Sequence, residues 1–116
     1  MNSAKIGCFA DKLLKRKHQV ILTLQHLKKE QGQVEENNDW LDAATHASRV
    51  RLLDRLTDWY LDEAARIERA LTRINAQSYG LCRACHRAIE PERLAAFPQA
   101  EFCLGCQVMR EKVERV

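Results

Sequence analysis

The chain has 116 residues, which leaves room for one compact domain, or for a small module joined to an elongated element, and not for two full-sized cores. Charged residues make up 30% of the chain and aromatic residues only 6%, and the formal net charge of +3 is too small to indicate nucleic-acid binding by itself. No apolar run approaches the roughly 18 residues of a membrane span. We therefore expect a cytoplasmic protein without a membrane-spanning segment.

The first third of the chain carries a heptad pattern that starts near Ser3. Apolar or neutral side chains recur at alternating steps of four and three residues, and Lys17 and Gln31 fill the two polar positions of the series. The pattern predicts a long helix that buries one stripe against another helix. The series consists of Ile6, Ala10, Leu13, Val20, Leu24, Leu27 and Val34.

A second series with the same alternation predicts the partner helix. It consists of Ala43, His46, Val50, Leu53, Thr57, Tyr60, Ala64, Ile67, Leu71 and Ile74. The polar run between the two series, which ends at Asp39, is rich in Asn and Asp and favours a turn. Arms of this length would be roughly 45 to 55 Å long. The same periodicity also fits a compact bundle or a homodimeric coiled coil, and Leu52, Leu56 and Trp59 could widen the buried face of the second arm near its end.

The C-terminal part of the chain contains two C-x-x-C motifs, Cys82 with Cys85 and Cys103 with Cys106. Two such motifs supply a closed tetrahedral set of four thiolates, which is typical of one structural Zn²⁺ per chain. A thioredoxin-like redox pair would need a single motif in a βαβ context, and His86 is a spare ligand at most. We expect a helical hairpin over residues 1–77 and a zinc module over residues 78–116, with a short terminal helix from Gln107.

Small residues accompany both motifs. Gly80 and Gly105 stand where tight metal-binding turns would need a residue without a side chain. The module has few apolar residues, so we expect its folding to depend on the metal.

With these residues in place, the chain resembles the DksA/TraR family of zinc-finger regulators, and most resembles its DksA side. The resemblance lies in Tyr79–Cys85, in Ile89, in Arg93–Ala96 with Pro98, and in Cys103–Cys106. It extends to Asp39–Ala44, which is similar to the tip motif of the family, two acids three residues apart followed by an alanine.

The resemblance implies a mainly α fold, a long antiparallel coiled-coil hairpin with its tip at about residues 35–44 and a small C-terminal four-cysteine zinc module. It also implies a monomeric, non-enzymatic protein that binds bacterial RNA polymerase, inserts the hairpin tip into the secondary channel and modulates initiation without contacting DNA. Asp39 and Asp42 would be the effector carboxylates, and Ala44 would let the tip pack closely. From the residues alone, Asp39 could instead be the N-cap of the second arm.

Family members that respond to the alarmone guanosine tetraphosphate (ppGpp) hold it with basic residues on the second arm and around the zinc module. The resemblance places those positions at Arg66, Phe97 and Gln107, with Glu63 nearby. Only Arg66 is basic, and a highly charged anion needs Arg or Lys donors. We expect weak dependence on ppGpp, with neighbouring Arg69 or Lys112 as the cation that could compensate.

Two other classes of function stay open at this point. A zinc ribbon that binds nucleic acid would use Arg83, Arg87 and Arg93, although several acids dilute their field and no aromatic platform accompanies them. A structural adaptor would use the hairpin only as a spacer. An enzyme is not expected, because the chain contains no recognisable set of nucleophile, base and orienting group.

Overall fold

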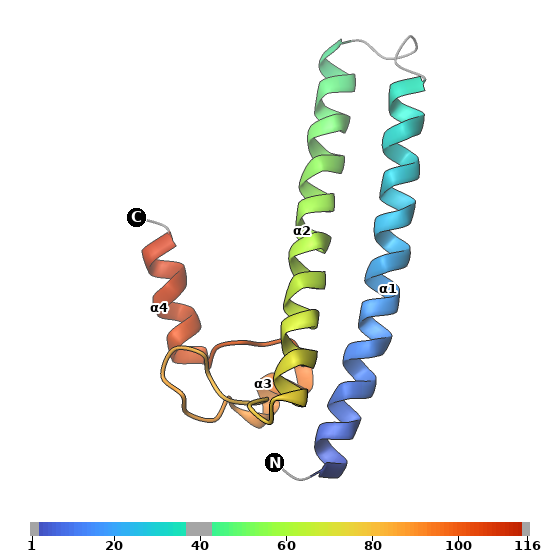
Figure 1. Ribbon diagram of the computed structural model, residues 1–116. Helices are drawn as coiled ribbons and strands as arrows, with labels where there is room; N and C mark the ends of the chain where they lie inside the picture. Colours follow the sequence, from blue (N-terminus) through green and yellow to red (C-terminus); the bar gives the residue numbers. More distant parts are fainter. Residues whose placement is uncertain (1–2, 37–42, 115–116) are drawn as a thin grey trace. The chain divides into compact units, whose positions relative to one another are not determined.

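The structure, a computed structural model of the chain, describes residues 3–36 and 43–114. It contains four helices, α1 (Ser3–Glu36), α2 (Ala43–Asn75), α3 (Pro91–Ala96) and α4 (Leu104–Glu114) (Figure 1). The described residues form no strand, and their β-structure is limited to one isolated antiparallel bridge between Leu81 and Ala88. The predicted mainly α class is therefore confirmed.

Contacts within the chain define two compact units, one of residues 17–65 and the other of residues 1–16 with 66–116. In the first unit, α1 and α2 lie side by side and antiparallel (Figure 1). Leu27 and Val34 of α1 and Leu53 of α2 form its buried core, and Val50 and Tyr60 pack against them. All five occupy positions of the predicted heptad series, so the predicted helix pairing is confirmed.

The polar positions of the two series meet in the same unit. Gln31 Nε2 donates to Asp54 Oδ1 at 3.4 Å and to Thr57 Oγ1 at 3.3 Å. Thr57 Oγ1 also donates to the Leu53 carbonyl oxygen at 2.8 Å. The polar position Gln31 in the α1 series therefore faces the polar position Thr57 in the α2 series. This pairing favours the observed register of the two helices over a shifted one.

The expectation of a wider buried face on the second arm is wrong. The exposed fractions of Leu52, Leu56 and Trp59 are 53%, 37% and 67%. In residues 17–65, α2 buries the narrow seam of the heptad series, and the neighbouring stripe stays in solvent.

The buried side chains of the second unit come from three helices and from the cysteine segment. Leu13 of α1, Ile67 of α2, Leu94 of α3 and Cys82 are almost completely buried there. Cys82 is the buried member of the four clustered cysteines. No helix among the described residues is long and apolar enough to cross a bilayer.

Candidate metal centre

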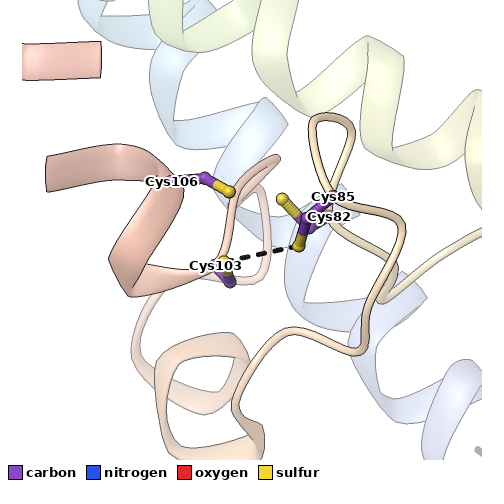
Figure 2. Close-up of side chains that lie close together, drawn as sticks. All are labelled: Cys82, Cys85, Cys103 and Cys106. Carbon is purple, nitrogen blue, oxygen red and sulfur yellow. Dashed lines mark hydrogen bonds between the residues drawn. The ribbon is translucent and has the colours of Figure 1, made fainter. Parts of the chain in front are cut away.

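The side chains of Cys82, Cys85, Cys103 and Cys106 converge on one point (Figure 2). Their Sγ atoms all lie within 4.8 Å of one another, and those of Cys85 and Cys103 are 3.8 Å apart. Four thiolates about 2.3 Å from one Zn²⁺ in a tetrahedron would be about 3.8 Å apart. The four thiols thus fit one zinc ion, with every coordination position filled by protein.

The first C-x-x-C motif is shaped by backbone hydrogen bonds that fold the chain back on itself. The Cys82 amide donates to the Arg87 carbonyl at 2.8 Å, the His86 amide to the Cys82 carbonyl at 3.0 Å, and the Ile89 amide to the Gly80 carbonyl at 2.8 Å. This path needs positive φ at Gly80 (86°) and at His86 (64°). The expectation for Gly80 is confirmed, whereas His86 contributes a left-handed backbone turn and is not among the clustered metal-binding side chains.

The second motif relies on a helix start. The Gln107 amide donates to the Cys103 carbonyl at 2.9 Å, and α4 begins at Leu104, earlier than the predicted Gln107. Glu90 Oε2 accepts a hydrogen bond from the Leu104 amide at 3.3 Å, which places a carboxylate at the positive end of α4. A side chain at Gly105 would meet no atom within 4 Å, so the expectation that Gly105 is required for a tight turn is wrong.

The environment of Cys82 favours its thiolate. Burial opposes ionisation, but hydrogen bonds from the backbone of Cys85, Cys103 and Ala84 outweigh it and lower the pKa of Cys82 to about 6. The pKa of Cys106 is raised to about 12, because its thiol hydrogen-bonds to the sulfurs of Cys103 and Cys82. Thiols crowded in this way repel one another as anions, and a bound cation would remove that repulsion and favour four thiolates.

A buried carboxylate connects the centre to α2. Glu101, with an exposed fraction of 7%, accepts hydrogen bonds from Arg69 Nε on α2 and from Arg83 Nη1 at 2.8 Å. Burial raises the pKa of Glu101, but the two guanidinium groups more than compensate and lower it below its ordinary value. The Arg83 amide also donates to the Glu101 carbonyl at 2.9 Å. Glu101 therefore holds α2 and both cysteine motifs together, a role that the sequence analysis did not predict.

Two further side chains, from Arg73 on α2 and from Tyr79 after its end, bond to the segment before Cys103. The Tyr79 hydroxyl donates to the Pro98 carbonyl at 2.8 Å, and burial raises the pKa of Tyr79 to about 12. Arg73 Nη2 donates to the Ala100 carbonyl at 3.2 Å. These bonds satisfy carbonyl groups of a loop that has no regular secondary structure of its own.

The predicted effector residues lie at the edge of what the structure describes. Asp39 and Asp42 fall outside the described residues. Ala44 lies in the first turn of α2, and its side chain is exposed.

The residues predicted to correspond to an alarmone site differ in character. Arg66 is half-buried on α2, and Phe97 is exposed after the end of α3. The side-chain amide of Gln107 donates through Nε2 to Glu111 Oε1 at 3.2 Å. Glu63 is buried. Among these described positions, Arg66 is thus the one cation. The others are the aromatic ring of Phe97, the side-chain amide of Gln107, which is bound to Glu111, and the carboxylate of Glu63.

The four clustered cysteines place the C-terminal module in the class of C4-type zinc fingers. Residues 77–112 match the family described as the prokaryotic dksA/traR C4-type zinc finger. The RNA polymerase-binding transcription factor DksA of Caulobacter vibrioides (strain NA1000 / CB15N) is 32% identical over 120 residues, which cover 100% of this chain and 82% of that protein. A protein of Aquifex aeolicus (strain VF5) is 31% identical over 121 residues, covering 99% of this chain and 80% of its own length.

Solved structures agree with the sequence comparisons. The structure of transcription factor DksA2 from Pseudomonas aeruginosa superimposes with a TM-score of 0.85 at 25% identity, covering 99% of this chain and 89% of that one. The chain belongs to the DksA/TraR family, and its cofactor is one structural zinc ion.

Proposed function

We propose that this chain is a transcription factor that binds bacterial RNA polymerase and modulates initiation. The observation that carries the proposal is its similarity, over 100% of its length, to a protein named as the RNA polymerase-binding factor DksA. The similarity spans both the paired helices and the cysteine module, so it covers the parts that such a factor would need for docking and for action.

In this proposal, the hairpin enters the secondary channel of the polymerase with residues 37–42 leading. That segment joins α1 to α2 and carries Asp39 and Asp42, whose carboxylates can accept charge-assisted hydrogen bonds from basic groups of the enzyme. Ala44 follows on the first turn of α2, where its small, exposed side chain leaves space for close approach.

The zinc centre has a structural role in this proposal. Cys82, Cys85, Cys103 and Cys106 would hold the ion, which supplies four strong bonds where the module has little apolar core. Glu101 then fixes the end of α2 against the module through its bonds to Arg69 and Arg83.

We also propose that the module makes no direct contact with DNA. Arg83 donates to Glu101, and Arg93 Nε donates to the Phe102 carbonyl at 3.0 Å. Two of the three arginines that suggested a nucleic-acid surface are thus engaged in holding the module together. The relatives are named as transcription factors, which supports a regulatory, non-enzymatic role. We further propose that the chain acts in the cytoplasm and as a monomer.

Dependence on ppGpp should be weak, because no second cation supports Arg66 at the corresponding positions described here. Of the two neighbours that could compensate, Arg69 is bound to Glu101 and Lys112 is exposed on α4. Gln107 is bound to Glu111. Redirecting Arg69 to an alarmone would leave the buried Glu101 carboxylate with one fewer partner, which is costly.

The test of the tip is in vitro transcription from a ribosomal promoter with polymerase, the zinc-loaded chain and variants Asp39→Asn and Asp42→Asn. We expect each variant to keep most of its polymerase affinity and to lose the effect on open-complex lifetime. Asp58→Asn, an exposed change of the same type on α2, is the matched control and should behave as wild type. Equal losses of affinity and activity in the tip variants would show that the acids are ordinary contact or capping residues.

A further inference from the structure

An apolar stripe on α2 lies in solvent within the unit formed by residues 17–65. It consists of Leu52, Leu56 and Trp59, whose spacing of four and three residues places them on one face of the helix. Trp59, the largest of the three, is also the most exposed, at 67%. Isolated exposed apolar side chains are common, whereas three in succession that include a tryptophan indicate a surface that another molecule covers.

A row of charged side chains runs along one edge of the stripe. It consists of Arg51, Arg55, Asp58 and Asp62, which are all exposed and follow the same spacing of four and three residues. The first two are basic and the last two acidic, so the sign of the charge reverses at the middle of the row. A second α2 that ran in the same direction would meet like charges, whereas one that ran in the opposite direction would meet unlike charges.

We propose that the stripe is the contact of a weak homodimer, in which α2 of a second copy packs on it in the opposite direction. A two-fold axis between residues 56 and 57 would bring Arg55 of each copy level with Asp58 of the other, so that this ion pair forms twice. Arg51 and Asp62 would also be level, but Arg51 donates to Ser48 and Asp62 has a partner within its own chain. The pair of Arg55 with Asp58 therefore carries the charge argument.

The same register interlocks the apolar side chains. Trp59 of one copy would be level with residue 54 of the other, midway between its Leu52 and Leu56. Leu56 would be level with residue 57, between Leu56 and Trp59 of the second copy. Each side chain thus enters a gap between two others, as side chains do where paired helices pack ridges into grooves. Charge and shape select one register independently of each other.

The small size of the contact makes the dimer weak. Three apolar side chains from each copy cover much less than the roughly 800 Å² per partner of a standard interface. The dimer would therefore accumulate only at high protein concentration, and the monomer remains the acting form. The inference goes beyond the proposed action on polymerase and does not rest on it, because the dimer forms between free chains.

The first test is sedimentation equilibrium of the zinc-loaded full chain from about 20 µM to about 1 mM, the range in which weak interfaces associate. We expect reversible dimerisation that Leu52→Gln and Trp59→Gln each weaken about tenfold. The matched control is Leu61→Gln, because Leu61 is 52% exposed, nearly the same as Leu52 at 53%, but lies on the opposite face of α2. It should dimerise as wild type.

The second test exchanges the charges. Arg55→Asp and Asp58→Arg should each weaken dimerisation on the order of fivefold, since exposed ion pairs contribute modestly. An equimolar mixture of the two variants should associate at least as strongly as wild type, because one copy then presents two acids and the other two bases.

The third test fixes the direction of the helices in a Cys8→Ser background. Leu56→Cys should form an intermolecular disulfide, because residue 56 of both copies lies beside the axis. Leu52→Cys should not, because the two residues 52 would be about 13 Å apart along the helices.

The proposal is overturned if the chain stays monomeric throughout, if Leu61→Gln weakens dimerisation as much as Leu52→Gln, or if mixing the charge variants restores nothing. Equal cross-linking of Leu52→Cys and Leu56→Cys would overturn the antiparallel arrangement. A monomeric chain whose Trp59→Gln variant instead loses affinity for polymerase would assign the stripe to polymerase and refute the dimer.

Discussion

Replacing Glu101 with alanine should loosen the metal centre without touching a cysteine. The change removes the acceptor for Arg69 and Arg83 and leaves the backbone hydrogen bond from the Arg83 amide to the residue 101 carbonyl in place. The change therefore measures how much the Glu101 side chain, as the bridge between α2 and the two cysteine motifs, contributes to stability.

The size of the effect follows from the exposure of the three groups. Each hydrogen bond to a charged group contributes about 1.5 to 3 kcal/mol. The side chains of Arg69 and Arg83 are 45% and 49% exposed, whereas that of Glu101 is 6% exposed, so water can take over much of the arginines' solvation after the change. We therefore expect a loss of about 2 to 3 kcal/mol for Glu101→Ala, and about 1 to 2 kcal/mol for Glu101→Gln, which keeps a neutral acceptor.

The assays are thermal unfolding followed by circular dichroism and zinc release to a chromogenic chelator. We expect Glu101→Ala to lower Tm by about 10 °C and to accelerate zinc release, because metal binding and folding of the module are coupled. Glu114→Gln, an exposed change at the end of α4, is the control. A double-mutant cycle with Arg83→Ala should give a coupling of about 1 kcal/mol or more. Additive effects, or zinc release at the wild-type rate, would refute the bridge.

Three other predictions concern separate parts of the chain. Cys82→Ser should remove one of the four zinc ligands, so zinc bound to the purified protein should fall from one ion per chain to near zero. Cys8→Ser, outside the cluster, should retain the zinc, and full zinc occupancy of Cys82→Ser would count against the assignment of four thiolate ligands. The pair Gln31→Leu and Thr57→Val should raise Tm, with a gain of about 1 to 2 kcal/mol, because it exchanges the two long hydrogen bonds of Gln31 for apolar packing. A lower Tm would mean that the polar pair stabilises the seam. On a polymerase without its other alarmone site, ppGpp should add little to the effect of this protein and Arg66→Ala should change little, whereas a strong dose-dependent enhancement would contradict this assignment.

The parts of the fold that the sequence predicted are those with a local, repeating cause. A step of three or four residues places Leu27, Val34 and Leu53 on helix faces whatever the rest of the chain does, and all three are buried. Likewise, two residues between cysteines bring both thiols of a motif to one side of a short turn. The spacing therefore predicted the cluster of four sulfur atoms correctly.

The parts that escaped prediction depend on partners far away in the chain. Glu101 is 32 residues from Arg69 and 18 from Arg83, and no periodic pattern links such positions. The expectation for Gly105 was wrong because α4 starts at Leu104 and forms the turn as a helix. A cavity lined by Phe9 of α1 and Leu94 of α3, among others, likewise depends on the approach of two helices that are far apart in the chain.

The most direct test of the central claim is whether the zinc-loaded chain binds core RNA polymerase in the absence of DNA at physiological salt. We predict saturable binding of one chain per polymerase, with Asp42→Asn retaining most of the affinity, and no binding to promoter DNA alone. Absence of binding to polymerase, together with salt-sensitive binding to DNA, would contradict the account and identify the module as a nucleic-acid-binding zinc ribbon.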